Sequence, residues 1–315
     1  MQSTVATQPP LQNTDLDYND TSNKYVVSTL GHLSYIAQNT SFWAYNYIQT
    51  ADIDATVSKY WDDVDDAGGA TGDKYNDDND ATSTGNNEGF LPIGNLITNF
   101  TGEYDGGGYS ISGLTIKRTT TGDSGKSIGL FGYTAGATIR NLGVTNDNIT
   151  GNEWVGSLVG YATFSTIIDN CSASGIVVST GTAGGLVGYP HSKTIIRNSY
   201  STASVNGGSG NNVGGLAGLA YNSTILNSYS TGSVVTSSSN RGGLIGAKYI
   251  SSLRSTTITD SFYDKATSGQ SDSGKGTGKT TAQMKTKATF TNWDFDTIWD
   301  IDTSGTINDG YPYLR

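Results

Sequence analysis

Two aspartates, with a third that could join them, have the chemistry to hydrolyse a glycosidic bond. Asp52 and Asp54 are two residues apart in a strand-like segment, so their side chains project from one face, roughly 7 Å apart. Inverting glycosidases place their general acid and general base at about this separation, and Asp105 could complete the cluster. Acidic pairs at this spacing are also common on polar strands and in turns. We therefore expect the chain not to be an enzyme, with a polysaccharide hydrolase or lyase as the alternative.

The acidic stretch 61–89 offers ligands for Ca²⁺, which takes about six to eight oxygen atoms. An EF-hand register that starts at Asp77 ends correctly at Glu88, but Ala81 and Thr82 stand where a ligand and a glycine belong. The stretch is therefore not an EF-hand, and it is either a structural Ca²⁺ site or a solvated acidic loop. The ligands predicted for the first case are Asp62, Asp63, Asp65, Asp66, Asp73, Asp77, Asp78 and Asp80.

Two histidines and one cysteine leave little scope for nucleophilic or metal chemistry. His32 lies in a predicted helix and His191 follows a proline in a predicted turn, and neither has a partner at a diagnostic spacing. Cys171 is less than one repeat away from His191, so stacking could bring the two together as nucleophile and base. We expect a small packing residue instead, because Cys171 takes the place that Ser199 and Ser228 have in later repeats.

A repeating scaffold must position these side chains. Five Gly-rich hexamers end on residues spaced 28, 28, 30 and 28 apart, and a fixed period of this size predicts stacked structural units. The 315 residues include 42 glycines and only 5 prolines, with abundant Ser, Thr, Asn and Asp, which is typical of short strands joined by tight turns. The predicted class is all-β. The hexamers are residues 128–133, 156–161, 184–189, 214–219 and 242–247.

A second landmark, an asparagine, recurs with almost the same period after the hexamers. In parallel strands about 4.8 Å apart, equal positions superpose, so each repeated residue type forms a column. If the asparagines are buried at a corner, their amides can hydrogen-bond to the equivalent amides above and below. We expect the valines seven residues further on to form a column in the core. The asparagines are Asn141, Asn170, Asn198 and Asn227, and the valines are Val177, Val205 and Val234.

An aromatic column is predicted two residues beyond the asparagine positions, at Tyr200, Tyr229 and Phe262. Rings that face outward could stack on sugar rings and form a ligand face, whereas rings that face inward would belong to the core. The alternation with the valines does not decide between these two orientations.

The hexamers resemble the GLUG repeat, which is named for a Gly-Leu-hydrophobic-Gly core. The surrounding phrases Pro92-Ile-Gly94, Asn227-Ser-Tyr-Ser-Thr-Gly-Ser-Val234 and Thr281-Ala-Gln-Met284 are also similar to this family. The resemblance extends from about residue 27 to the end. It implies a right-handed parallel β-helix on the outside of a bacterial or archaeal cell, usually as one module of a larger adhesin-like protein.

Three positions depart from the repeat. Leu219 and Ala247 replace the tyrosine that closes the other hexamers, and Ser157 replaces the second glycine. These positions either contact another molecule or have drifted in a tolerant repeat.

The predicted organisation is a solenoid with a cap at each end. It comprises an extended leader 1–24, an N-terminal cap 25–50, first rungs 51–125 with the acidic insertion 61–89, repeats 126–264 and a C-terminal cap 265–315. A helix over residues 29–38, with Thr29 as its N-cap, is expected to cover the first rung, and Trp293 and Trp299 are expected to plug the last one. The first ten residues lack the regions of a secretory signal, and we expect that such a signal has been removed.

The net charge of -10 argues against binding to nucleic acid or to anionic lipid, and no stretch has the apolar length of a membrane span. We expect a non-enzymatic, extracellular module of the cell surface with an adhesive or structural role. Its partner would be a surface glycan, a protein ligand or copies of itself. A subunit of an extracellular filament, in which the leader completes a neighbour's sheet, is a further alternative. No cofactor is expected except Ca²⁺.

Overall fold

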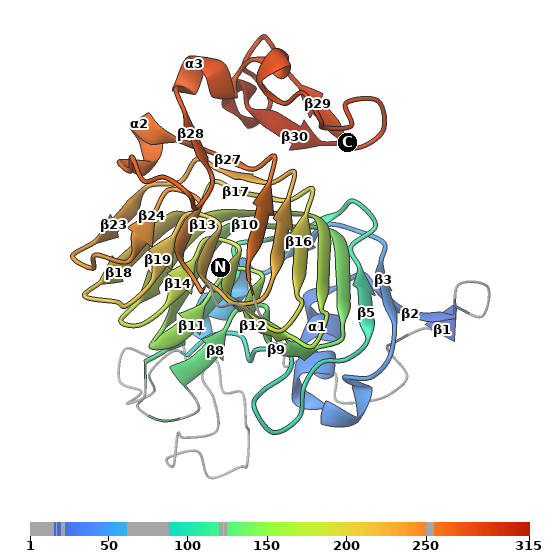
Figure 1. The fold of residues 1–315 in the computed structure, drawn as a ribbon. Coiled ribbons are helices and arrows are strands. Elements are labelled where there is room, and N and C mark those ends of the chain that lie inside the picture. Colours follow the sequence, from blue (N-terminus) through green and yellow to red (C-terminus); the bar gives the residue numbers. More distant parts are fainter. Residues whose placement is uncertain are drawn as a thin grey trace, which may run out of the picture.

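The computed structural model describes residues 16, 18–19, 23–61, 88–119, 122, 125–249 and 255–315. Its strands stack almost entirely in parallel, rung upon rung, between the blue and the orange ends of the ribbon in Figure 1. From residue 126 onward, each rung crosses three sheets in the same order. The predicted all-β class is confirmed.

Two of the sheets contain five parallel strands each, and the hexamers form the bend between them. Sheet 1 contains β8 (Lys126–Ile128), β11 (Glu153–Val155), β14 (Ala183–Gly184), β19 (Val213–Gly214) and β24 (Arg241–Gly242). Sheet 2 contains β9 (Phe131–Ala135), β12 (Val159–Thr163), β15 (Val187–Pro190), β20 (Ala217–Ala220) and β25 (Ile245–Lys248).

Sheet 3 is the widest sheet and also includes the first rungs. Before the repeats it contains β1 (Tyr18–Asn19), β2 (Lys24–Val27), β3 (Tyr47–Gln49), β4 (Ile53–Asp54), β5 (Glu103–Asp105), β6 (Ser110–Ser112) and β7 (Thr115–Arg118). The repeats add β10 (Thr138–Gly151), β13 (Ile167–Ser179), β16 (Ile195–Arg197), β17 (Tyr200–Ser201), β18 (Ser204–Gly208), β21 (Thr224–Leu226), β22 (Tyr229–Ser230) and β23 (Val234–Thr236). The last strands are β26 (Thr257–Thr259), β27 (Phe262–Asp264) and β28 (Thr277–Lys279).

Equal positions of successive repeats superpose, as the period predicts. Val159 of β12 pairs with Phe131 on one side and with Val187 on the other. Val205 pairs with Val177 and with Val234 in the same way, so the predicted valine column is confirmed. The hexamer leucines form a second column, and each of them is fully buried in the core: Leu130, Leu158, Leu186, Leu216 and Leu244.

The glycines of the hexamers lie where the backbone of a neighbouring rung comes very close. A Cβ atom on Gly188 would lie 2.5 Å from the carbonyl carbon of Trp154 and 2.6 Å from the carbonyl oxygen of Gly160. The φ angle at Gly188 is outside the left-handed region. Glycine is therefore required at this corner by close backbone approach.

The repeated asparagines bend sheet 3. Asn141, Asn170, Asn198 and Asn227 all have left-handed φ angles between 47° and 58°, which asparagine tolerates better than most residues. Asn170 Nδ2 donates to Asn141 Oδ1 at 2.9 Å, but Asn198 Nδ2 donates to Asp169 Oδ1 at 3.0 Å. Hydrogen bonding between equivalent amides is therefore confirmed for Asn141 and Asn170, whereas Asn198 bonds to a carboxylate instead. The feature that all four asparagines share is the backbone bend.

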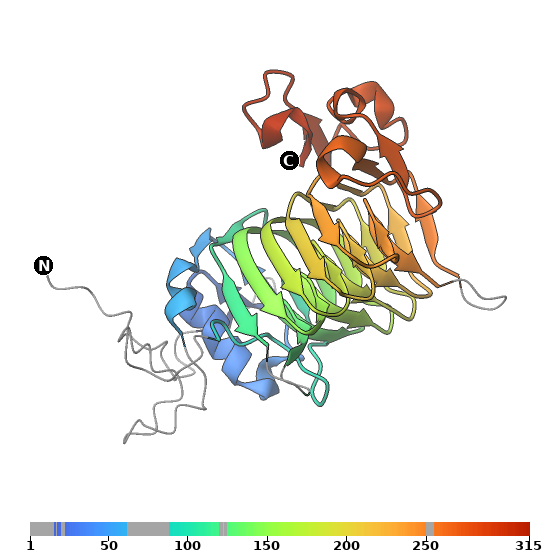
Figure 2. The ribbon, with the colours of Figure 1, turned by 90° about the vertical axis from the view of Figure 1, so that its left-hand side faces the viewer.

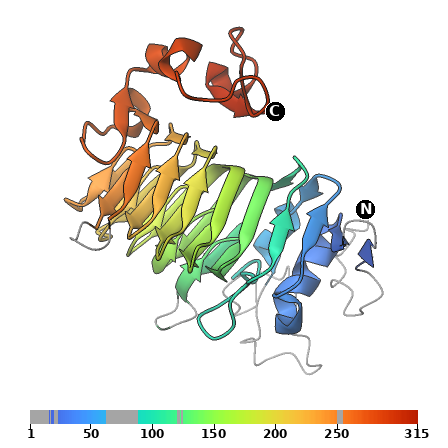
Figure 3. The same ribbon diagram turned by 45° about the vertical axis from the view of Figure 1, so that its right-hand side comes forward.

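A helix covers the first rungs, as predicted. α1 (Leu30–Gln38) begins after Thr29, whose side chain accepts a hydrogen bond from the backbone N–H of His32 at 3.2 Å. Leu33, Ile36 and Ala37 are buried in the core of the rungs, and Figure 3 shows the helix beside the blue strands. Two short 3-10 helices follow, η1 (Thr40–Phe42) and η2 (Thr56–Tyr60).

Residues 265–279 close the last rung. They contain α2 (Lys265–Ser268) and β28, which pairs with β27. Asp272 Oδ1 accepts a hydrogen bond from the backbone N–H of Gly243 at 2.8 Å, and Lys275 Nζ donates to the carbonyl oxygen of Gly246 at 2.8 Å. These bonds attach the segment to the last hexamer.

Residues 280–315, the C-terminal segment, fold back along one side of the stack (Figures 2 and 3). Trp293 and Trp299 contact Tyr229 in a hydrophobic cluster separate from the core of the rungs. Trp293 contacts Phe262 of the last rung, and its Nε1 donates to the carbonyl oxygen of Asp260 at 2.8 Å, so the predicted contact with the last rung is confirmed for Trp293. The cluster lies on the side of the stack, however, and residues 265–279 close its end. The segment contains α3 (Thr281–Met284), η4 (Lys287–Thr289), β29 (Trp299–Ile301), η5 (Asn308–Gly310) and β30 (Pro312–Leu314).

Candidate binding surface

The three aspartates proposed as catalytic groups have separate partners and are not assembled as a cluster. Asp52 Oδ1 accepts hydrogen bonds from the backbone N–H and the hydroxyl of Ser110, at 2.8 and 3.0 Å. Asp54 Oδ1 accepts from the backbone N–H of Thr56 at 2.9 Å, and hydrogen bonding to Thr56 lowers the pKa of Asp54. Both carboxylates therefore organise local turns and strand ends.

Asp105 belongs to a row of alternating charges across neighbouring strands of sheet 3. Its carboxylate lies 2.8 Å from a guanidinium nitrogen of Arg140 and 3.4 Å from Lys24 Nζ. Burial alone would raise the pKa of Asp105, but hydrogen bonds from Asn141 and Gly107 and the two cations outweigh it, so the pKa lies below its ordinary value. A general acid needs the opposite shift. The environment of Asp105 therefore suits an ion pair.

The predicted Ca²⁺ ligands between Asp62 and Asp80 lie outside the described residues. Glu88, the last residue of the tested EF-hand register, is buried and forms an ion pair with Arg118 at 2.7 Å. Among the described residues, no group of three or more His, Cys, Asp or Glu side chains could hold a metal ion. Calcium binding by the acidic stretch therefore stays a prediction from the sequence.

Cys171 and His191 do not form a nucleophile and base pair. Cys171 is fully buried in sheet 3, and burial raises the pKa of its thiol to about 12. The thiol donates to the carbonyl oxygen of Asp169 at 3.3 Å, and the backbone N–H of Cys171 donates to Ser199 Oγ. His191 follows β15 and stacks on Tyr221, as described below. The expected packing role of Cys171 is consistent with this environment.

His32 has a local structural role. Its Nδ1 accepts a hydrogen bond from the backbone N–H of Ser28 at 3.2 Å, beside the N-terminus of α1.

The aromatic column at Tyr200, Tyr229 and Phe262 lies beneath the C-terminal segment. The three residues superpose in register, as predicted, and the rings of Tyr200 and Tyr229 stack at 5.0 Å with planes 3° apart. Tyr229 is fully buried, and its hydroxyl donates to the carbonyl oxygen of Pro312. The column therefore faces away from the core of the rungs but meets the chain's own C-terminal segment. Of the two orientations that the sequence leaves open, an open ligand face is excluded for Tyr229, because the C-terminal segment covers it.

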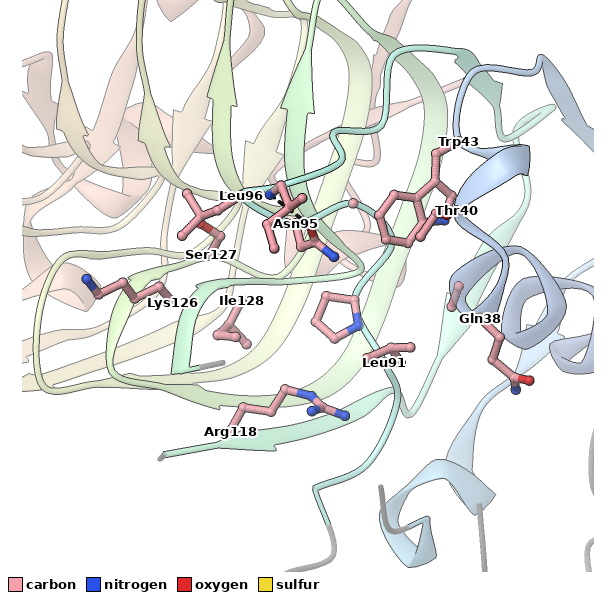
Figure 4. Close-up of a pocket in the computed structure, with 14 residues that line it drawn as sticks. Gln38, Thr40, Trp43, Leu91, Asn95, Leu96, Arg118, Lys126, Ser127 and Ile128 are labelled. Carbon is pink, nitrogen blue, oxygen red and sulfur yellow. Dashed lines mark hydrogen bonds between the residues drawn. The ribbon is translucent and has the colours of Figure 1, made fainter. Parts of the chain in front are cut away.

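A pocket of about 410 Å³ lies between α1, the loop 91–97 and β8. Figure 4 shows Trp43, Leu91 and Ile128 around it, with the cation Arg118 below and the cation Lys126 at the left. Its lining is mostly apolar, and Trp43 Nε1 donates to the carbonyl oxygen of Ile36 within the cap. The pocket thus follows from the packing of the N-terminal cap on the first rungs.

A continuous stripe of half-exposed aromatic rings crosses five successive rungs along sheet 2. Tyr133 and Tyr161 stack at 4.6 Å with planes 15° apart, and Tyr161 contacts Tyr189 edge to face at 4.9 Å. His191 stacks on Tyr221 at 4.6 Å, and Tyr221 contacts the more exposed Tyr249 at 4.8 Å. We call Tyr133, Tyr161, Tyr189, His191, Tyr221 and Tyr249 the aromatic stripe.

The stripe stays continuous because, in the later rungs, the aromatic residue stands two positions further along the sequence. Residues two apart in a strand project from the same face. Tyr189 and His191 therefore lie side by side, and His191 pairs with Tyr221 in the next rung. Leu219 and Ala247 lack the ring, but Tyr221 and Tyr249 supply it two positions later. The offset of two residues is present in the sequence, but its meaning is clear only when the register of the rungs is known.

The stripe can offer both apolar contact and hydrogen bonds. Burial raises the pKa of Tyr133, Tyr161 and Tyr189, so these phenols stay protonated at neutral pH and can donate as well as accept. Trp154 extends the surface sideways, since its ring lies 4.9 Å from that of Tyr161. A ligand that runs along the stack would meet a ring on every rung.

Ser157, the other departure from the repeat, faces the interior. It is fully buried, and the core position that Ser201 and Ser230 occupy in later rungs is taken by the smaller Ala173 in this one. Gly185 is the residue of the next hexamer that corresponds to Ser157, and a Cβ atom there would lie 2.1 Å from Ser201 Oγ. Ser157 therefore fits in its own rung because the residue opposite, Ala173, is smaller than a serine.

Three stretches of the chain, residues 151–178, 179–206 and 209–235, match the family model of the GLUG motif. A Gly-rich membrane protein of Evansella cellulosilytica is 44% identical over 121 residues, which is 37% of this chain and 13% of that protein. Halomucin of Haloquadratum walsbyi is 34% identical over 159 residues, which is 49% of this chain and 1% of halomucin. The chain thus spans only a small part of the length of these relatives. No solved structure matches it.

Within the described ranges, no helix has the length and apolar character needed to cross a membrane. The chain therefore contains three GLUG motifs, whose hexamers stack in register, and it is similar over part of its length to the two relatives.

Proposed function

We propose that this chain is a non-catalytic, adhesive module displayed at the outer surface of a cell. The GLUG motifs and the relatives, one of which is named as a membrane protein, support the location. The observation that carries the adhesive role is the aromatic stripe, because it presents rings on five consecutive rungs. Many weak contacts along a stiff rod add up to firm attachment.

The described candidates for catalysis support a binding role over a reaction. Asp52, Asp54 and Asp105 are each held by their own hydrogen bonds or ion pairs, and Cys171 is buried away from solvent. Incubation with neutral and acidic polysaccharides tests this assignment. New reducing ends or unsaturated products would contradict a non-catalytic module.

A retention assay tests adhesion directly. Beads that carry the chain are passed over surfaces coated with polysaccharides or with proteins, and the fraction retained under flow is measured. Replacing Tyr161 and Tyr221 with serine should reduce retention about tenfold, since two rings of the stripe are lost. Tyr109→Ser removes a 39% exposed ring on the first rungs and is the matched control. Retention of wild-type beads no greater than that of bare beads would refute the proposal.

We also propose that the three sheets close into a right-handed parallel β-helix. Each repeat visits the sheets in the same order, and crossovers between parallel strands of one sheet are right-handed in nearly all proteins. A crystal structure with left-handed coils or open sheets would contradict this.

A further inference from the structure

One corner of the stack, between sheets 2 and 3, carries an open hollow of about 460 Å³. Its lining comes from the turns of three successive rungs, which stack in register. Ser165 N donates to the carbonyl oxygen of Ser192 at 3.0 Å, and Ser192 N donates to that of Tyr221 at 3.1 Å. Because His191 and Tyr221 adjoin these turns, the hollow lies beside the aromatic stripe. The lining residues are Phe164, Ser165, Ser192, Lys193 and Asn222.

Two of these turns hold side chains in backbone conformations that favour glycine or asparagine. The φ angles are 49° and 66° at Phe164 and Ser165, and 44° and 69° at Ser192 and Lys193. In each turn a backbone hydrogen bond joins the residues on either side of the pair, as in a type I′ turn. Asn-Gly is the usual pair at such positions, and a bulky side chain is costly there.

In the neighbouring rungs, a glycine or an asparagine takes the left-handed conformation at this bend. Gly136 in the rung before and Asn222 in the rung after have φ angles of 66° and 49°. Phe164 is 67% exposed, so its ring gains little packing energy to offset the unfavourable backbone. Strained conformations with no evident structural benefit gather at functional sites. The exposed ring and the neighbouring lysine are therefore better explained by a ligand.

The charge around the hollow differs from that of the whole chain. Lys193 is the one charged residue in the lining, and it forms no ion pair within the described part of the chain. Residues 126–264 contain seven Lys and Arg against five Asp and Glu, whereas residues 1–125 contain five against seventeen. The acidic character thus lies ahead of the repeats, and an anionic ligand can approach this corner.

We infer that this corner binds an acidic saccharide. The exposed ring of Phe164 offers an apolar surface for the C–H face of a pyranose, and the serine hydroxyls and the Asn222 amide offer partners for its hydroxyl groups. The ammonium group of Lys193 pairs with the carboxylate of the sugar. The inference rests on the proposed adhesive function and adds the class of its ligand.

Isothermal titration calorimetry of the full chain with tetragalacturonate tests this inference. Lys193→Gln should weaken binding about tenfold, while Lys193→Arg should restore most of it. Phe164→Asn should also weaken binding about tenfold and at the same time raise the melting temperature, because asparagine adopts the left-handed conformation more readily. Phe164→Tyr keeps the ring and should keep the affinity. A residue with only a structural role would not combine weaker binding with higher stability.

Lys265→Gln removes an exposed charge from α2 and is the matched control, with unchanged affinity expected. The methyl ester of tetragalacturonate should bind at least tenfold more weakly to the wild type. No heat of binding, or equal affinity of wild type and Lys193→Gln, would overturn the inference.

The retention assay separates this inference from the proposed function. Wild-type beads that hold to a surface as firmly as Phe164→Asn beads would overturn the saccharide site and leave adhesion standing. Retention on protein-coated surfaces alone would also overturn it. If no coated surface retains wild-type beads, the adhesive function fails, whatever the calorimetry shows.

Discussion

The imidazole ring of His191 lies flat on the phenol ring of Tyr221, with centroids 4.6 Å apart and planes at 12°. The two residues are thirty positions apart and come from neighbouring rungs. This contact is the point at which the aromatic stripe passes from one residue position to another.

His191→Ala should lower the free energy of unfolding by about 1 kcal/mol, which is typical of an aromatic pair. Urea denaturation followed by circular dichroism measures the change. His191→Phe keeps a flat ring and should behave like the wild type. Equal free energies of unfolding for His191→Ala and His191→Phe would show that the stacking contributes nothing.

Gly188→Val should destabilise the stack by several kcal/mol, on the order of other overpacked substitutions. The reason is steric, since a Cβ atom there would lie 2.5 Å from the backbone of Trp154. Thermal unfolding gives the measurement. Gly143→Ala is the control, because its nearest atoms would be 3.3 Å away, and it should cost much less. Wild-type melting of Gly188→Val would refute the close packing of the corners.

Asp147→Asn should raise stability at neutral pH by about 1–3 kcal/mol. Asp147 is 2% exposed, and burial raises its pKa well above the ordinary value, an effect that Ser157 and the backbone of Ile176 offset only in part. The raised pKa of Asp147 therefore stabilises the folded wild type fully below about pH 4, the pKa of an aspartate in the unfolded chain. This stability is lost as the pH rises through the raised pKa of the folded state. Free energies of unfolding measured from pH 4 to 8 should fall for the wild type and stay flatter for Asp147→Asn.

Asp105→Asn should show the opposite pH dependence. The carboxylate of Asp105 has a lowered pKa because of Asn141, Gly107, Arg140 and Lys24, in spite of its burial. It therefore stabilises the fold above about pH 4 and loses this contribution as the pH falls through the lowered pKa. The variant should be less stable than the wild type at pH 7, by about 1–3 kcal/mol, and the difference should shrink in acid. A difference that is constant with pH would rule out the ion pair as its origin.

Trp299→Ala should loosen the C-terminal segment and leave the rungs intact. Trp299 is fully buried in the cluster on the side of the stack, which is separate from the core of the rungs. Removing a large aromatic side chain costs about 3–5 kcal/mol. Hydrogen exchange should quicken in residues 280–315 and stay slow at the Val205 column. Faster exchange throughout the chain would mean that the segment and the rungs unfold as one unit.

Much of the scaffold follows from the sequence alone, because a fixed period forces equal positions to superpose. The period of about 28 residues predicts the columns of Leu186 and Val205, and the pattern at Thr29 predicts the N-terminal helix. These features depend on local spacing and on contacts between identical positions. Neither kind of information requires knowledge of distant packing.

The candidate binding surface becomes visible only in the tertiary structure. A ring at residue 189 and a ring at residue 221 look unrelated in the sequence, since the hexamer tyrosine is missing in the later repeats. Only the register of His191 with Tyr221 shows that a shift of two residues keeps the ring on the same face. The burial of Tyr229 likewise depends on the path of the C-terminal segment, which covers it. Periodicity determines which residues share a column, whereas solvent exposure depends on which distant segments cover it.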